Sequence, residues 1–260
     1  MRRRDRHRRS RLHGHVRRHA DGFTLVELAI TVSIIGVLSL VVSSAYFSIA
    51  EVRARALAQG QAEVARQAIR AFLLKNKRLP CPDRSAGGNG GREGLAGTCP
   101  AGQVGWLPYE SLGLALPVPS VRMRYAVSRT AAADLVEPAG GTSGGFDFDG
   151  NGRIRNTLVA TAKLSPSSAR PFLTGVGTPS DAESCAHVVS NPAFALIAPV
   201  SDRDASGGAH AGFDGINQQM ATADSTCIAA PGRAMDASYD DVVVAESASA
   251  LLGWLAAHTR

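Results

Sequence analysis

The sequence is poor in the residues from which most catalytic sites are built. Only three of its seven histidines, His187, His210 and His258, lie beyond residue 22. The chain has no Walker loop, no helical zinc-protease motif and no glycine fingerprint for a dinucleotide. GGTSGG (140–145) lacks the strand-and-turn context of a hydrolase nucleophile. We therefore expect that the protein is not an enzyme. Its content of 45% hydrophobic residues indicates a globular chain.

The chain also lacks a basic body. Its net charge is +6, but residues 1–22 hold nine arginines and two aspartates, which give +7 and leave −1 for the remainder. Because binding to nucleic acid depends on cations that neutralise phosphates, nucleic acid is an unlikely partner. One local patch at Arg122, Arg124 and Arg129 is the exception that the sequence leaves open.

A long uncharged run follows the basic leader. The 23 residues from Leu28 to Ala50 carry no charge, and a helix of that length spans about 35 Å, enough for a hydrocarbon core of about 30 Å. The apolar core of a secretory signal has only about 7–15 residues. We therefore expect a retained transmembrane helix over 23–50, with the N-terminus in the cytoplasm because basic flanks stay inside.

The residues Gly22-Phe23-Thr24-Leu25-Val26-Glu27 lie between that leader and the apolar run. They resemble the cleavage and methylation signal of type IV prepilins and type II secretion pseudopilins. The resemblance implies that prepilin peptidase cleaves after Gly22 and N-methylates Phe23. It also implies that the helix joins other pilins or pseudopilins at an inner-membrane assembly platform. Many family members have a proline where this chain has Ser43-Ser44, which favours a minor or initiating subunit.

Glu27 is an acid at the start of an apolar helix. A carboxylate in hydrocarbon is costly unless it is paired, which makes it a candidate functional residue. Cleavage after Gly22 would create an amine on Phe23. Glu27 could pair with this amine in its own chain or with the amine of a neighbouring chain. The resemblance favours the neighbour, where the pair would set subunit register. The alternative is a carboxylate that rests in the lipid headgroup region.

The rest of the chain predicts an α+β fold, with a long N-terminal helix packed on a small antiparallel β-sheet domain with long loops. We expect one helix over 24–77, with an apolar face made by Ala58, Ala62, Ala65, Ile69 and Phe72. Short strands are expected over 121–128, 157–162, 193–200 and 239–245, and a final helix over 247–258. The predicted regions are a prepilin leader (1–22), a transmembrane and assembly helix (23–50), an amphipathic helix (51–78) and an extracytoplasmic domain (79–260).

The four cysteines all follow the apolar run, which fits an oxidising, periplasm-like compartment. Sequence order suggests the disulfides Cys81–Cys99 and Cys185–Cys227, although four cysteines allow three connectivities. The alternative is a metal site, for which Cys185-Ala186-His187 is the only indication, because the spacings do not follow a zinc-finger pattern.

Two acidic loops are candidate calcium sites. Asp147, Asp149 and Asn151 occupy the first, third and fifth positions of a calcium-loop spacing, and Gly152 follows. Position twelve is Leu158 instead of glutamate, and Asp-Gly-Asn-Gly is also an ordinary turn sequence. The second loop has Asp202, Asp204 and Ser206. The adjacent acids Asp240-Asp241 are expected to cap a strand.

Together these features predict a pilin-like structural subunit of the bacterial inner membrane, with its C-terminal domain in the periplasm. Two alternatives remain at this point. The domain beyond Leu79 could be a binding module, such as an adhesin or a DNA-uptake minor pilin. The chain could also be a plain membrane-anchored periplasmic protein that prepilin peptidase does not shorten.

Overall fold

In the computed structural model of the chain, the described residues are 24–94, 99, 102–137, 151–175, 184–203, 212–222 and 225–258. Within these ranges, the side chains at 41, 44–48, 151 and 221–222 are left out of the description. The chain divides into two compact units, Met1–Ile49 and Ala50–Arg260. Each unit is described by itself below.

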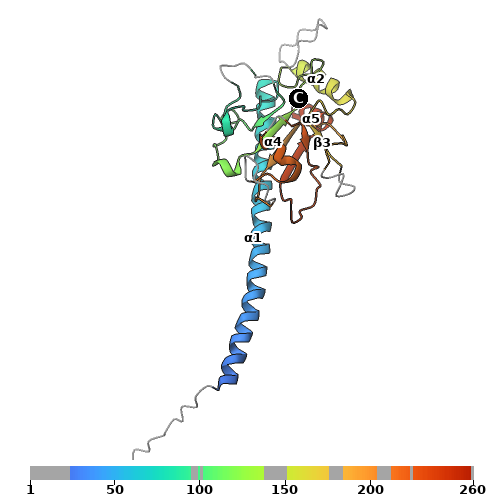
Figure 1. Cartoon of the computed structure of the whole chain (residues 1–260). Helices are drawn as coiled ribbons and strands as arrows, with labels where there is room; N and C mark the ends of the chain where they lie inside the picture. Colours follow the sequence, from blue (N-terminus) through green and yellow to red (C-terminus); the bar gives the residue numbers. More distant parts are fainter. Residues whose placement is uncertain are drawn as a thin grey trace, which may run out of the picture. The chain divides into compact units, whose positions relative to one another are not determined.

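Helix α1 (Leu25–Asn76) is one continuous helix of 52 residues, drawn from blue to cyan in Figure 1. This confirms the long helix expected over 24–77, since the sequence has good helix formers and no proline before Pro80. The helix ends at Asn76, and the next residue, Lys77, has a φ of 57° and donates its N–H to the Leu73 carbonyl at 2.9 Å. This left-handed residue is a common helix terminator.

In the second unit, α1 buries the face that its spacing predicts. Ala58, Ala62, Ala65, Ile69 and Phe72 are all buried. The alanines at the start of this face keep the helix surface narrow, whereas the larger residues near its end fill the core. The apolar spacing from Ala58 to Phe72 is therefore explained by packing against the core.

A four-stranded antiparallel sheet forms the centre of the second unit, in the order β1-β2-β4-β6. Its strands are β1 (Val104–Trp106), β2 (Arg124–Val127), β4 (Phe194–Ala198) and β6 (Val242–Glu246). A separate pair of short parallel strands consists of β3 (Phe172–Leu173) and β5 (Cys227–Ile228). The predicted α+β class with antiparallel pairing is confirmed.

The sheet separates two hydrophobic clusters because alternate strand residues point to opposite faces. On one face, Tyr125 and Leu196 belong to a cluster with Ile69 of α1 and Leu251 of the C-terminal helix. On the other face, Ile197 and Val243 pack in a second cluster with residues of the 213–229 region. The second cluster therefore places Phe213, Ile216 and Met220 over the sheet, on the face opposite the buried residues of α1.

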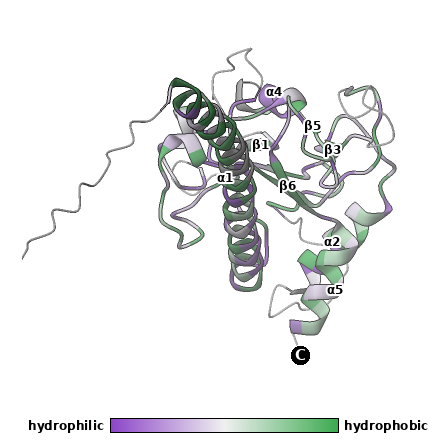
Figure 2. Cartoon of the chain, turned by 90° about the horizontal axis from the view of Figure 1, so that it is seen from below, coloured by the Kyte–Doolittle hydropathy of each residue, from purple (hydrophilic) through white to green (hydrophobic). Residues whose placement is uncertain are grey.

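The remaining helices are α2 (Asn151–Lys163), α4 (Gln218–Thr222) and α5 (Ala248–His258), with short 3-10 turns η1 (Ala86–Gly88), η2 (Pro119–Val121) and η3 (Gly215–Asn217). Helix α5 confirms the helix expected over 247–258. Figure 2 shows α2 and α5 next to each other.

The strand expected over 157–162 is wrong, because these residues lie inside α2. Ile154, Thr157, Leu158 and Thr161 are buried, which is the spacing of a helix face. The two β-branched threonines are accommodated because each donates its hydroxyl to the carbonyl four residues earlier, at 2.9 and 2.8 Å.

The other expected strands exist with shorter bounds. The region 121–128 contains the end of η2 and then β2, and β4 lies inside 193–200. The strand expected over 239–245 begins only at Val242, after Asp240 and Asp241. Strand β1 falls at the start of a segment whose sequence is typical of irregular structure, and it was not predicted.

Candidate functional site

At the start of α1, Thr24 and Glu27 form reciprocal hydrogen bonds. The Thr24 backbone N–H and hydroxyl donate to Glu27 Oε2 at 2.9 and 3.0 Å. In return, the Glu27 N–H donates to Thr24 Oγ1 at 3.2 Å. This is a capping box, which satisfies backbone donors that have no partner inside the helix. Glu27 therefore has a local structural role that was not predicted, although Thr-Leu-Val-Glu carries the signature of such a cap.

The cleavage and methylation residues Gly22 and Phe23 lie outside the described residues. The predicted pairing of Glu27 with an amine on Phe23 therefore stays a prediction. Glu27 itself is exposed, and its Oε1 accepts no hydrogen bond from a described residue.

Large apolar side chains cover the first half of α1, and each is at least half exposed. They are Leu25, Val26, Leu28, Ile30, Val32, Ile34, Ile35, Val37, Leu38, Leu40, Val42 and Ile49. Figure 2 shows the N-terminal turns of α1 coloured hydrophobic, whereas hydrophilic colour enters along its later turns. Contiguous exposed apolar surface of this kind marks a site of interaction with protein or lipid. We call residues 25–49 the apolar half of α1.

Three hydroxyl side chains of this half bond back to their own helix. Thr31, Ser33 and Ser39 each donate a hydroxyl to the carbonyl four residues earlier, at 2.8 to 2.9 Å. The hydroxyls therefore compete little for an outside partner. The transmembrane helix predicted over 23–50 is not confirmed, since no helix in the described ranges combines sufficient length with sufficient apolar character to cross a membrane.

Two disulfides hold the second unit together. Cys81 is bonded to Cys99 and Cys185 to Cys227, the pairing that sequence order suggests, and the described chain has no free cysteine. Cys185 is thus occupied by a sulfur partner, which removes the alternative of a metal site at Cys185-Ala186-His187.

The arginine patch that the sequence left open for nucleic acid does not form. Arg122 is 5% exposed and donates to the carbonyls of Pro117 and Gly87. Arg124 is equally buried and lies over the ring of Trp106, 4.8 Å from its centroid. Arg129 is paired with Asp134. Since Arg122 and Arg124 are buried and the half-buried Arg129 is already paired, these arginines do not form an exposed basic patch for nucleic acid.

Neither predicted calcium loop is tested by the structure. Asp147 and Asp149 lie outside the described residues, and Asn151 is the first residue of α2. In the second loop, Asp202 is exposed, whereas Asp204 and Ser206 are outside the described ranges. Calcium binding at Asp147, Asp149 and Asn151 stays a prediction.

A cluster of three buried aspartates is the most unusual polar feature of the described chain. Asp214, Asp240 and Asp241 are at most 1% exposed, and one oxygen of each lies within 4.8 Å of those of the others. Asp214 precedes η3, whereas Asp240 and Asp241 lead into β6. The Asp214 N–H donates to Asp241 Oδ2 at 3.0 Å, and the Asp240 N–H donates to Asp214 Oδ2 at 2.9 Å. We call these three residues the aspartate cluster.

Burial dominates the electrostatics of the aspartate cluster. It raises the pKa of the Asp214 carboxyl to about 6 and raises the pKa of Asp241 well above its ordinary value. Arg203 Nε donates to Asp240 Oδ2 at 2.8 Å, and this bond raises the pKa of the guanidinium. The same guanidinium lies 3.2 Å from Glu51 on α1.

From the sequence, Asp240-Asp241 were expected only to cap a strand, and no connection with Asp214 was predicted. The one available signal was two adjacent acids directly before a strand of valines, a position where burial is expected. Nothing in the neighbouring sequence indicates that Asp214, 26 positions before Asp240, accepts a hydrogen bond from it.

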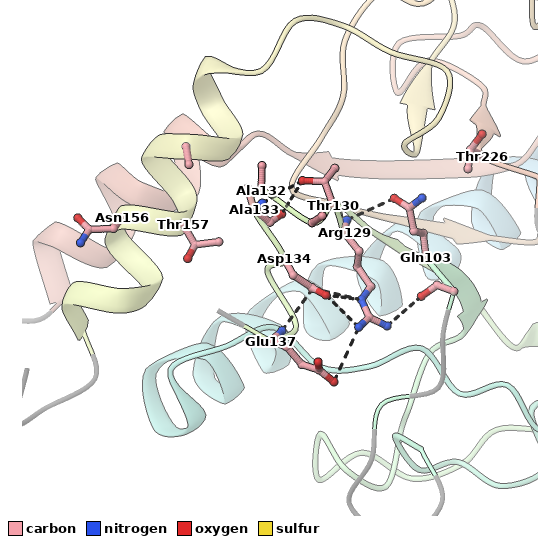
Figure 3. Close-up of a pocket in the computed structure, with 13 residues that line it drawn as sticks. Gln103, Arg129, Thr130, Ala132, Ala133, Asp134, Glu137, Asn156, Thr157 and Thr226 are labelled. Carbon is pink, nitrogen blue, oxygen red and sulfur yellow. Dashed lines mark hydrogen bonds and ion pairs between the residues drawn. The ribbon is translucent and has the colours of Figure 1, made fainter. Parts of the chain in front are cut away.

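A large cavity beside Arg129 has a volume of about 810 Å³. Figure 3 shows the Arg129 side chain directed at Asp134 and Glu137, which lie 2.9 and 3.8 Å from its Nη2. Thr130, Thr157 and three consecutive alanines complete much of the wall. The described residues that line this cavity include no histidine or cysteine, and their charged groups are already paired with one another. The described part of the wall therefore shows no arrangement for acid–base or nucleophilic chemistry.

The comparisons with known proteins bear on the N-terminal segment. Neither the curated proteins nor the solved structures contain a match to the chain. The family model for the prokaryotic N-terminal methylation motif matches residues 17–43, a stretch that contains Gly22, Phe23 and Glu27 and reaches into the apolar half of α1. The motif implies processing by prepilin peptidase and assembly with other pilin-type proteins. The chain therefore carries, at its N-terminus, the methylation motif of type IV pilin-like and pseudopilin-type proteins.

Proposed function

We propose that the chain is a pilin-like structural subunit of a type IV pilus or a type II secretion pseudopilus. Prepilin peptidase cleaves the precursor after Gly22 and N-methylates Phe23. The subunit acts by assembly and catalyses no reaction. The absence of a proline at Ser43-Ser44 favours a minor or initiating position over that of the repeating subunit.

One observation carries this proposal. The matched motif at 17–43 coincides with a helix that is apolar and uncharged from Leu28 to Ala50 and whose described apolar side chains are exposed. Such a surface is unfavourable in water, at roughly 25 cal/mol for each Å² of apolar area. Lipid before assembly, and the helices of neighbouring subunits afterwards, would cover it.

Glu27 has a second function in this proposal. The capping box uses Oε2, which leaves Oε1 as an acceptor for the amine that cleavage creates on a neighbouring Phe23. In an apolar surrounding, such a pair is favoured over either charge alone. The pair would fix the axial position of one subunit against the next.

The two disulfides support a location outside the cytoplasm for the second unit, because such bonds persist in oxidising compartments. We therefore place the chain at the bacterial inner membrane, with its leader in the cytoplasm and the second unit in the periplasm. An inner-membrane assembly platform would move it from there into a filament.

Assembly can be tested in a bacterium that has a working pilus or secretion machine. We expect the mature chain in the sheared filament fraction, together with other pilin-type subunits. Leu38→Arg, which places a charge on the apolar half of α1, should abolish incorporation. Val189→Arg is a matched control, since Leu38 and Val189 are 57% and 58% exposed and Val189 lies in the second unit. The wild-type chain missing from filaments, or equal incorporation of both variants, would contradict the proposal.

A further inference from the structure

We propose that the aspartate cluster, Asp214, Asp240 and Asp241, binds one divalent cation of the calcium type. The site lies in the second unit and does not depend on the proposed assembly function. It differs in all its residues from the two loops that the sequence suggested.

The spacing of the three carboxylates fits one ion. One oxygen from each lies within 4.8 Å of the others. Calcium binds oxygen at about 2.3–2.6 Å, so two ligands on opposite sides of the ion are about 5 Å apart. The three oxygens are therefore close enough together to share a single ion.

One carboxylate oxygen in the cluster has no partner among the described residues, and this is a second observation that points to a ligand. Each of the other five oxygens accepts a hydrogen bond: those of Asp214 from the N–H groups of Arg203 and Asp240, those of Asp240 from Ser201 and Arg203, and Asp241 Oδ2 from Asp214 and Asn217. Asp241 Oδ1 is fully buried and accepts none from the described residues. Buried polar atoms in folded proteins almost always have a partner, and a cation supplies one.

The charge of the cluster also calls for a dication. Three ionised carboxylates carry −3, and the guanidinium in contact with them, that of Arg203, contributes +1 but also pairs with Glu51 at 3.2 Å. The neighbouring Arg233 is engaged elsewhere: it lies over the Tyr239 ring, 3.9 Å from the centroid, and 3.6 Å from Asp236. A divalent ion would offset most of the negative charge of the cluster, which lowers the penalty for buried, unbalanced charge.

The surroundings hold the ligands in position. Asp240 and Asp241 are fixed by the start of β6, and Asp214 by the start of η3. The Asn217 amide donates to Asp241 Oδ2 at 2.9 Å and to the Tyr239 hydroxyl at 3.2 Å, while its own oxygen accepts from the Ala229 N–H at 3.0 Å. Groups that orient ligands in this way are typical of metal sites, and they maintain the ligand geometry before the ion arrives.

The ligand set favours calcium over other metals. All three groups are carboxylates, which are hard ligands, and neither histidine nor cysteine is part of the cluster. Magnesium prefers a regular octahedron in which it keeps several waters, a poor match to carboxylates with at most 1% exposure. Calcium tolerates irregular geometry, so we expect it to bind more tightly than magnesium.

The test uses the full chain, purified in detergent micelles and stripped with a chelator. We expect calorimetric titration with CaCl2 to show one site per chain and a higher thermal midpoint in calcium than in EDTA. The diagnostic variant is Asp241→Asn, because its amide oxygen can replace Oδ2 while its NH2 group occupies the position of the unpartnered Oδ1. It should fold, with a midpoint in EDTA no lower than that of the wild type, and should bind calcium more than about tenfold more weakly. Even the loss of a group that merely orients a ligand weakens binding by about 10- to 100-fold.

Asp202→Asn is the matched control, since Asp202 is an exposed acid in the same loop region and does not belong to the cluster. Its calcium affinity should equal that of the wild type. The proposal is overturned if the wild type gives neither binding heat nor a change in midpoint with millimolar calcium. It is also overturned if Asp241→Asn binds as the wild type does, or if only Asp149→Asn reduces binding, which would assign the ion to the loop at 147–151.

Discussion

Thr24 and Glu27 donate hydrogen bonds to each other across the first turn of α1, and the Thr24 N–H lies 2.9 Å from Glu27 Oε2. A charge is not needed for this arrangement, because glutamine serves at the same capping position. Pairing with a neighbour's amine, in contrast, needs the negative charge. The two functions of Glu27 can therefore be separated by substitution.

We expect Glu27→Gln to be cleaved and methylated as the wild type is, because the start of α1 is preserved. Its incorporation into filaments should fall to background, because the charge pair is lost. Glu27→Ala should lose both the cap and the charge. Immunoblots of sheared filaments, with mass spectrometry of the mature N-terminus, provide the measurement. Normal incorporation of Glu27→Gln would leave Glu27 with a capping role alone.

Arg70 and Glu246 join α1 to the end of β6. Arg70 Nη2 lies 2.7 Å from Glu246 Oε1, and Glu246 is only 3% exposed. Removal of the cation leaves a buried carboxylate without its partner, so Arg70→Ala should lower the free energy of unfolding by about 3–5 kcal/mol. Urea denaturation in detergent, followed by circular dichroism, would measure this.

The double variant Arg70→Ala/Glu246→Gln should recover part of that loss, since the orphan charge is gone. Arg66→Ala is the control on the same helix: Arg66 pairs with Glu63 at the surface, and its loss should change the free energy by less than about 1 kcal/mol. Equal effects of Arg66→Ala and Arg70→Ala would show that burial of Glu246 is unimportant.

Two buried tyrosines should make the second unit sensitive to alkali. Burial raises the pKa of Tyr109 to about 12 and raises the pKa of Tyr125 well above its usual value. In the unfolded chain both ionise near pH 10. Because the folded state holds these protons more tightly, their contribution to stability is complete below about pH 10 and is lost as pH rises towards 12.

We expect Tyr125→Phe to show a shallower fall in unfolding midpoint between pH 9 and pH 11 than the wild type. At neutral pH it should lose only about 1 kcal/mol, from the hydrogen bond that the Tyr125 hydroxyl donates to the Pro80 carbonyl. Identical slopes for wild type and variant over this pH range would rule out Tyr125 as a source of the sensitivity.

The parts of the fold that local chemistry determines could be predicted from the sequence. Helix α1 follows from helix-forming residues without an interrupting proline, and its buried face from the spacing of Ala58 to Phe72. Sequence order suggested the two disulfides that form, although it left three connectivities open. The methylation motif is a short contiguous sequence and needs no tertiary information.

Features that depend on contacts distant in sequence could not be predicted. The run at 157–162 has strand-like threonine, valine and leucine, yet burial of Ile154 and Leu158 against the core makes it helical. Arg122 and Arg124 look like a surface patch until their carbonyl and ring partners are known. The aspartate cluster is the clearest case, since Asp214 meets Asp240 only after folding.

Cleavage after Gly22 is the event on which the proposed function depends most. Intact-mass spectrometry of the full chain, co-expressed with a prepilin peptidase, tests it directly. We expect a mature protein that lacks residues 1–22 and carries one added methyl group on Phe23, whereas Gly22→Val stays at precursor mass. A wild-type chain that keeps Met1–Gly22 in the presence of active peptidase, or that is cleaved at another bond, would contradict the proposed function.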